Sequence, residues 1–247
     1  MDRLIYTAMT GASHVLNQQA AVAQNLANVN TPGYRAAINT FRAVPLVGEG
    51  LPTRTFVVDS TAGSDFGLGV LQSTGRPLDV AVQGQGWFAV QLADGSDAYT
   101  RNGSFQLTSN GILQTRNGLN VMGDGGPITI PADTEVSVAK DGTISTVPSG
   151  SQPSQVVVVG RIKLVNPPEG QMTRGDDGLF RTRDGNVADA DAGVAVVSGN
   201  IESSNVNVVG SMVDMISLAR QYDMQMKLLQ SADTNARQAT TLLSLNG

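Results

Sequence analysis

Few side chains in this chain of 247 residues could carry out chemistry, and their spacing matches none of the common catalytic sites. Cysteine is absent, which excludes thiolate catalysis and cysteine-ligated zinc. His14 is the only histidine, so a Ser-His-Asp triad would have to use it and a site with several histidines is impossible. His14 lies in a helical pattern without a nucleophile motif nearby. We therefore predict that His14 lies on a helix face and has no catalytic role.

Acidic and glycine-rich segments are the remaining candidates for a ligand site. Asp189-Ala190-Asp191-Ala192-Gly193 and Asp176-Asp177-Gly178 lack the alternating ligands and distal Glu of an EF-hand. Gly84-Gln85-Gly86 and Gly67-Leu68-Gly69 lack the third glycine of a dinucleotide loop. We predict turns at all four, and no catalytic residue, metal site or cofactor. The chain is not expected to be an enzyme.

The elements that the sequence predicts most strongly are a helix at each end. Apolar residues recur every three or four positions, the heptad spacing of a coiled coil. The N-terminal series is Ile5, Ala8, Ala12, Val15, Val22, Leu26 and Val29. The C-terminal series is Met212, Met215, Ala219, Tyr222, Met226, Leu229, Ala236 and Leu243. We predict helices over about 4–29 and from Asn207 or Ser211, two competing caps, to 243, paired as a coiled coil.

The polar face of the N-terminal helix carries almost no charge. Between Leu4 and Tyr34 the polar residues are amides and hydroxyls, and His14 is the one side chain inside that span that can carry a charge near neutral pH. Uncharged amides can be buried in a contact at less cost than ions. This face therefore favours contact with other protein, whereas the C-terminal helix keeps a charged stripe. Asn25 and Asn28 are read either as the polar end of the helix or as contacts between subunits.

The middle of the chain reads as strands and tight turns. From Arg76 onward, alternating apolar residues are punctuated by Asn-Gly and Asp-Gly pairs, which favour hairpin turns. Residues 36–71 look irregular, apart from a short strand at 55–58. We predict an α+β fold with long terminal helices and a central antiparallel β-rich body. Its divisions are a helical domain at 1–35 and 205–247, connectors at 36–75 and 184–204, and a β-rich outer domain at 76–183.

Charge and hydropathy narrow the classes of partner. The net charge of −5, without a Lys/Arg cluster, argues against nucleic acid. No window approaches 18 uninterrupted apolar residues, so no membrane insertion is expected. A Sec-type signal is not recognisable at the start of the chain. The absence of thiols is compatible with export.

Four segments together resemble the axial proteins of the bacterial flagellum, the rod and hook subunits. They are Asn25-Leu26-Ala27-Asn28-Val29-Asn30-Thr31-Pro32-Gly33-Tyr34, Arg76-Pro77-Leu78-Asp79-Val80-Ala81-Val82-Gln83-Gly84-Gln85-Gly86-Trp87-Phe88, Tyr99-Thr100-Arg101-Asn102-Gly103-Ser104-Phe105, and Gly199-Asn200-Ile201-Glu202-Ser203-Ser204-Asn205-Val206-Asn207. Three further segments are similar to the proximal rod subtype: Met1-Asp2-Arg3-Leu4-Ile5-Tyr6-Thr7-Ala8-Met9, Phe41-Arg42-Ala43-Val44-Pro45 and Arg174-Gly175-Asp176-Asp177-Gly178.

The resemblance implies a structural subunit of the periplasmic rod that transmits torque. Expected partners are proximal and distal rod subunits, copies of itself and the flagellar type III export apparatus. A distal rod or hook-type subunit, and a secreted β-rich fibre or adhesin with helical oligomerisation ends, remain alternatives. The expected assembly interface comprises Ile5, Ala8, Ala12, Val15, Val22, Asn25, Leu26, Asn28, Met212, Met215, Ala219, Tyr222, Met226 and Leu229.

Overall fold

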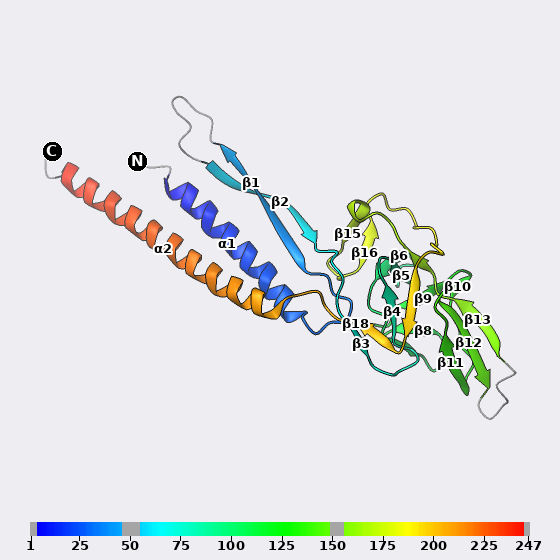
Figure 1. The fold of residues 1–247 in the computed structure, drawn as a ribbon. Coiled ribbons are helices and arrows are strands. Elements are labelled where there is room, and N and C mark those ends of the chain that lie inside the picture. The colour runs from blue at the N-terminus through cyan, green and yellow to red at the C-terminus, as the bar shows by residue number, and fades with distance from the viewer. Residues whose placement is uncertain (1–3, 46–54, 149–155, 245–247) are drawn as a thin grey trace. The chain divides into compact units, whose positions relative to one another are not determined.

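The computed structural model describes residues 4–45, 55–148 and 156–244 (Figure 1). The chain folds into two compact units, each assembled from segments distant in sequence. Unit 1 contains Met1–Ala27, Ala37–Ser64 and Asn207–Gly247, and unit 2 contains Asn28–Ala36 and Asp65–Val206. The chain therefore crosses from one unit to the other several times.

Unit 1 consists of two helices and a hairpin. Helix α1 spans Leu4–Ala27 and helix α2 spans Val208–Ser244. Strands β1 (Ala37–Pro45) and β2 (Thr55–Ser64) pair antiparallel, with a register shift between Thr40 and Phe41. Helix α1 contacts α2 and both strands, and lies between α2 and the hairpin in Figure 1.

The prediction that the terminal helices pair as a coiled coil is wrong. A coiled-coil helix presents one apolar seam to its partner, but α1 is packed on two sides, by α2 and by the hairpin. Its Gly11 faces the polar Gln225 of α2, and its His14 ring lies 5.7 Å from the Phe41 ring of β1. A helix with little charge can pack on more than one side, and heptad spacing alone cannot exclude this.

The start of α2 settles the choice between its two predicted caps. The Asn207 side-chain oxygen accepts a hydrogen bond of 3.0 Å from the Gly210 N–H, and its carbonyl accepts one of 2.9 Å from the Ser211 N–H. Asn207 therefore caps the helix, as expected of an Asn at this position. Ser211 lies one turn inside α2. Farther along, Arg237 and Asp233 form an exposed i,i+4 ion pair at 2.9 Å.

Unit 2 is built of short antiparallel strands around one large sheet. The nine-stranded sheet has the order β15-β16-β6-β5-β9-β8-β7, with β10 beside β9 and β14 beside β5. Three smaller sheets are β11-β12-β13, β17-β4 and β18-β3. The strand bounds are β3 Leu71–Ser73, β4 Val80–Gln83, β5 Trp87–Gln91, β6 Asp97–Thr100, β7 Phe105–Leu107, β8 Leu113–Thr115, β9 Asn120–Gly123, β10 Gly126–Pro127, β11 Thr134–Val138, β12 Thr143–Pro148, β13 Val157–Arg161, β14 Leu164–Val165, β15 Met172–Arg174, β16 Phe180–Thr182, β17 Ala195–Ser198 and β18 Asn200–Glu202. A 3-10 turn at Glu169–Gln171 precedes β15.

Strand β5 is the centre of the β body because both of its faces are buried. Phe88 belongs to one apolar cluster, whereas Trp87 and Ala89 belong to a second, and Val90 is also fully buried. Successive side chains of a strand point to opposite faces, so β5 divides the two clusters. A central strand of this kind is apolar throughout instead of alternating.

Strand β1 of the hairpin was not predicted from the sequence, and β2 was predicted only at residues 55–58. Residues 37–45 were expected to be irregular, yet they form a strand of nine residues. Asn25 of α1 holds its first residue: the Asn25 side chain accepts from the Ala37 N–H at 2.7 Å and donates to the Ala37 carbonyl at 3.0 Å. Pairing and packing by elements distant in sequence thus decide this strand.

The acidic segments lie in turns. Asp177 pairs with Arg181 at 2.6 Å and Asp191 accepts from the Gly193 N–H at 2.8 Å. Within the described residues, no three acidic, His or Cys side chains gather as a metal site. Neither described helix is long and apolar enough to cross a membrane.

Candidate functional site

The most highly buried charged side chains of unit 2 meet at the carboxylate of Glu202, the last residue of β18. Arg35 Nη1 lies 2.8 Å from Glu202 Oε1, and Arg101 Nε donates to Oε2 at 2.7 Å. All three side chains are at most 2% exposed. Residues from near both ends of the chain and from its middle therefore form one buried ion cluster, which we call the Glu202 cluster.

Arg101 also holds the backbone of the loop before β5. Its Nη1 donates to the Gly86 carbonyl at 2.5 Å and its Nη2 to the Gly84 carbonyl at 2.8 Å. Burial lowers the pKa of the Arg101 guanidinium, as does the charge of Arg35, whereas the Glu202 carboxylate raises it. Breaking a buried pair of this kind is costly because the remaining charge has no compensation.

Two glycines allow the backbone to approach this cluster. The Gly69 N–H donates to Glu202 Oε1 at 2.8 Å, and a Cβ at Gly69 would lie 1.9 Å from the Ser203 carbonyl oxygen. The Gly33 N–H donates to the Glu202 carbonyl at 2.8 Å. Gly33 has a φ of +69°, and its Cβ would lie 2.4 Å from the Arg101 carbonyl carbon. Neither position can accept a side chain without backbone movement.

Asn205 ties the same segments together beside the cluster. Its side-chain oxygen accepts from the Ala36 N–H at 2.7 Å, and its amide nitrogen donates to the carbonyls of Asp65 and Gly67, each at 2.9 Å. All four bonding positions belong to unit 2. The segment before β1 and the segment before α2 are thus fixed to one another by side-chain bonds.

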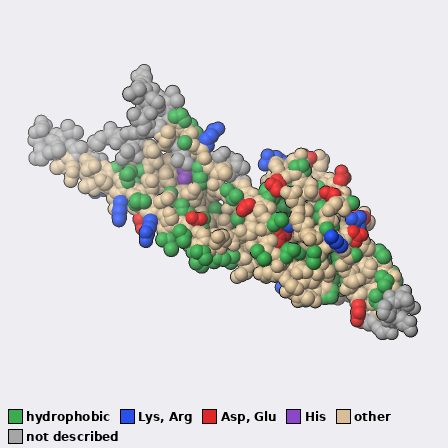
Figure 2. All heavy atoms as spheres, viewed as in Figure 1, with side chains coloured by type: hydrophobic (Ala, Val, Ile, Leu, Met, Phe, Trp, Pro, Cys, Tyr) green, Lys and Arg blue, Asp and Glu red, His purple; other side chains and the backbone are tan. Residues whose placement is uncertain are grey.

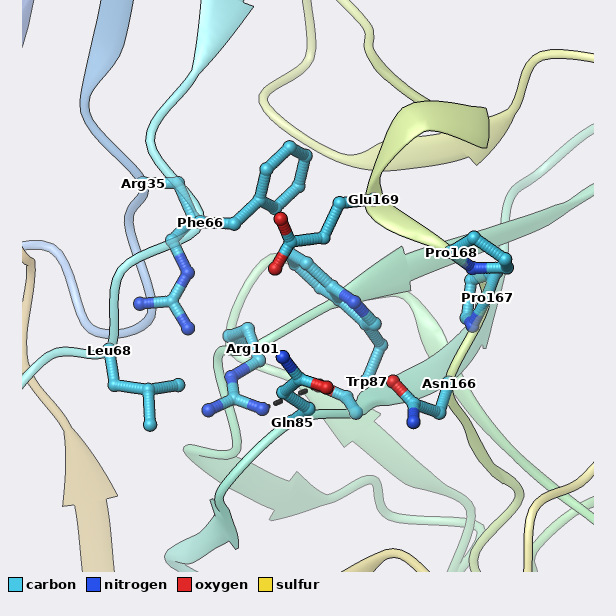
Figure 3. Close-up of a pocket in the computed structure, with 11 residues that line it drawn as sticks. Arg35, Phe66, Leu68, Gln85, Trp87, Arg101, Asn166, Pro167, Pro168 and Glu169 are labelled. Carbon is cyan, nitrogen blue, oxygen red and sulfur yellow. Dashed lines mark hydrogen bonds between the residues drawn. The ribbon is translucent and has the colours of Figure 1, made fainter.

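A cavity of about 480 Å³ lies beside the Glu202 cluster within unit 2 (Figure 3). Arg35 and Arg101 line it together with the apolar side chains of Phe66, Leu68 and Trp87. The Trp87 ring centroid lies 5.9 Å from the Arg35 guanidinium carbon and 6.0 Å from that of Arg101. Both distances permit a cation–π attraction.

In unit 1 the distinctive surface is an exposed apolar stripe on the first turns of α2. Val209, Val213 and Ile216 are 71%, 60% and 57% exposed. Their spacing places them on one helix face, and Figure 2 shows hydrophobic side chains gathered over this part of α2. An apolar face of this kind favours contact with another chain.

Three family models match this chain in succession. A model described as "Flagella basal body rod protein" matches residues 5–35, the "Flagellar hook protein FlgE/F/G D1 domain" matches 81–146, and the "Flagellar basal body rod FlgEFG protein C-terminal" matches 197–242. The flagellar basal-body rod protein FlgF of Escherichia coli (strain K12) is 51% identical over the full length of both chains. This chain belongs to the FlgF family of flagellar basal-body rod proteins.

Other relatives include a second FlgF protein and the rod protein FlgG. FlgF of Salmonella typhimurium is 50% identical over the full length of both chains. The rod protein FlgG of Buchnera aphidicola subsp. Acyrthosiphon pisum is 31% identical, over 93% of this chain and 95% of that protein. The expected resemblance to flagellar axial proteins, and among them to FlgF, is confirmed, and the adhesin alternative is not supported.

Each of the three matched family regions contributes one residue to the Glu202 cluster. Arg35 ends the first region, Arg101 lies in the second and Glu202 in the third. The cluster therefore joins segments shared by the rod and hook families. Arg101 and Glu202 lie within the motif segments that resemble axial proteins, but no role was predicted for either residue. The available signal was a single charged residue within an otherwise nearly uncharged segment.

The structure places the expected interface residues in three different surroundings. Ala8, Ala12 and Asn25 are buried. Ile5, Met212, Ala219 and Met226 are exposed. The others are half-buried: Val15, Val22, Leu26, Asn28, Met215, Tyr222 and Leu229. Asn25 holds Ala37 of the same chain, and Asn28 accepts from the Thr31 hydroxyl at 3.2 Å.

The more buried positions of α2 differ from the expected series. Leu218 is buried and Gln225 half-buried, whereas the expected Ala219 and Met226 are exposed. Leu218 also lines a cavity of about 300 Å³ together with Gln18, Val22 and Asn39. One face of α2 thus packs inside unit 1, and α2 also carries apolar residues outside that face.

Proposed function

We propose that this chain is a structural subunit of the flagellar basal-body rod and assembles there with other axial flagellar proteins. Full-length identity of 51% to a rod protein supports this function. The same comparisons favour a structural over a catalytic role. The proposal places the chain in the rod of the basal body.

The observation that carries the assembly role is the exposed apolar stripe of Val209, Val213 and Ile216. Fully burying one such side chain stabilises a contact by about 1.5–3 kcal/mol. Helix α1 adds Tyr6 and Met9, which are 63% and 55% exposed. Contact with a neighbouring axial subunit would remove this surface from water.

The expected interface residues then have two distinct roles. Ile5, Met212, Ala219 and Met226 are exposed and can touch a neighbour directly. The buried residues Ala8, Ala12 and Asn25 act indirectly, because they hold α1 in place within unit 1. The uncharged polar face of α1 permits contact with a neighbour without burial of ions.

Four finer assignments belong to the same proposal. The higher identity to FlgF than to FlgG favours the proximal part of the rod over its distal part. We further propose that the chain leaves the cytoplasm through the flagellar type III export apparatus and contacts both proximal and distal rod subunits. In the rod it would transmit torque.

The test is complementation of a strain that lacks this gene. Val213→Asp puts a carboxylate at the centre of the stripe, and the cost of burying that charge should abolish swimming and rod assembly. The purified variant should keep wild-type circular dichroism, because Val213 is 60% exposed.

Val187→Asp is the matched control. Val187 is 57% exposed and belongs to unit 2, whereas the stripe belongs to unit 1. It should restore swimming fully. Wild-type motility and basal bodies in the Val213→Asp strain would contradict the assembly role of the stripe.

A further inference from the structure

We propose that the cavity beside the Glu202 cluster is a docking site for an acidic side chain carried on a segment of a neighbouring axial subunit. The class of partner rests on the proposed function, whereas the site is argued from unit 2 alone. The volume of about 480 Å³ is typical of sites that bury a ligand. It would admit a short stretch of chain bearing one carboxylate.

Charge at the base of the cavity favours an anion. Arg35 and Arg101 both line the cavity, and both pair with the single carboxylate of Glu202. Among the described residues, no ion pair brings a second carboxylate to either guanidinium. The base therefore holds two positive charges and one negative charge. A buried excess of one cation is costly, and an incoming carboxylate would offset it.

Arg35 also has a buried donor without a partner. Its side chain is 1% exposed, and its Nε donates no hydrogen bond to the described atoms, whereas its Nη1 forms the ion pair with Glu202 Oε1 at 2.8 Å. Arg101, in contrast, donates from Nε, Nη1 and Nη2. In Figure 3 the two guanidinium groups lie on the same side of the cavity. Charge-assisted bonds from a guanidinium to a carboxylate are the strongest that an Arg makes.

The walls fit an amino-acid side chain better than a bare inorganic anion. Phe66, Leu68 and Trp87 offer apolar surface for the methylene groups of a Glu, and Pro167 and Pro168 extend it. The amides of Gln85 and Asn166 are exposed and also line the cavity. They can bond the backbone of an incoming segment.

Glu169 is the described carboxylate that opposes binding. It is exposed, lines the cavity, and in Figure 3 its carboxylate is directed toward Phe66 and Trp87. A negative charge there repels an anionic guest. It also provides a way to strengthen the site, because its removal should not disturb the fold.

The full chain can be tested with its own reporter, because Trp87 is the only tryptophan. Trp87 fluorescence is followed during titration with N-acetylglutamate N-methylamide, and with N-acetylglutamine N-methylamide as the neutral counterpart. A saturable change is expected with the acid, and about ten-fold weaker binding with the amide. Equal responses to the two compounds would overturn the site.

Variants localise the binding. Arg35→Lys keeps the charge but loses the planar donor fork. It should lower the affinity for the acid probe about ten-fold. Arg174→Lys is the matched control, because Arg174 bonds the Arg35 carbonyl at 3.1 Å but does not line the cavity. Glu169→Gln should raise the affinity for the acid probe about two-fold at low salt. If Arg35→Lys fails to fold, Glu169→Gln decides, and unchanged affinity there would overturn the proposal.

The identity of the partner is tested separately in cells. A photo-crosslinking amino acid at Leu68 should yield an adduct with an axial subunit, mapped to a segment containing Asp or Glu. Probe binding without such an adduct would mean that the cavity takes only a free carboxylate, which overturns the docking role. Complementation by Val213→Asp tests the proposed assembly role of α2, and its outcome does not depend on probe binding or cross-linking at the cavity.

Discussion

Replacing Glu202 with glutamine should destabilise unit 2 strongly, although the substitution conserves shape. The Glu202 carboxylate accepts hydrogen bonds from the Gly69 N–H at 2.8 Å and the Arg101 Nε–H at 2.7 Å, and it forms an ion pair with Arg35 Nη1 at 2.8 Å. Gln keeps one acceptor oxygen but places an amide donor against one of these donors. It also leaves two buried guanidinium groups without a counter-charge.

The size of the effect follows from these contacts. A hydrogen bond to a charged group contributes about 1.5–3 kcal/mol, and loss of one member of a buried ion pair costs about 3–5 kcal/mol. We expect Glu202→Gln to lower the free energy of unfolding by about 3–5 kcal/mol. With a urea m-value of about 2 kcal/mol/M, the unfolding midpoint should fall by about 1.5–2.5 M.

Trp87 fluorescence is the appropriate assay, because its ring centroid lies within 6.0 Å of both guanidinium carbons. Glu135→Gln is the control: Glu135 is an exposed residue on β11, and its loss should shift stability by no more than about 0.5 kcal/mol. If Glu202→Gln lost less than about 1 kcal/mol, the cluster would not hold the three segments together as argued.

Three further substitutions test other parts of the argument. Gly33→Ala should cost more than about 3 kcal/mol in urea unfolding, because its φ is +69° and the new Cβ meets Arg101 backbone at 2.4 Å; a near-neutral result would contradict the close approach. Asn207→Ala should cost about 1 kcal/mol of α2 stability, seen as lower far-ultraviolet helicity on heating, because the Gly210 N–H loses its cap. Burial raises the pKa of Tyr99 above its usual 10.0, so the folded state holds its proton longer and the free energy of unfolding should fall as pH rises above about 10. Tyr99→Phe should reduce that fall in urea titrations at pH 8 and above 10, and an unchanged slope would refute the assignment.

Family and element types were accessible from the sequence because they depend on local patterns. Apolar spacing predicted both helices, and Asn-Gly and Asp-Gly pairs predicted the antiparallel β body. The motif segments predicted a flagellar axial protein, which the full-length relatives confirm. Each of these signals is contained within about thirty residues.

Helix pairing was not accessible in the same way. The heptad spacing of α1 states that an apolar stripe exists, but not how many elements cover it. The hairpin β1–β2 supplies a second packing surface, and its local sequence predicted a strand only at residues 55–58. Gln225 replaces Met226 on the inner face of α2 because rotation about the helix axis is set by what the helix packs against.

The sequence by itself therefore determined the two helices, the β-rich body and the family to which this protein belongs, because propensity and motif are read within a segment. Only the tertiary structure decided that Arg35, Arg101 and Glu202 form one cluster, since 101 residues separate the last two. It also decided that Asn25 holds Ala37 of its own chain. Whether a buried charge stabilises the fold depends on its partner, and no local pattern identifies a partner so distant along the chain.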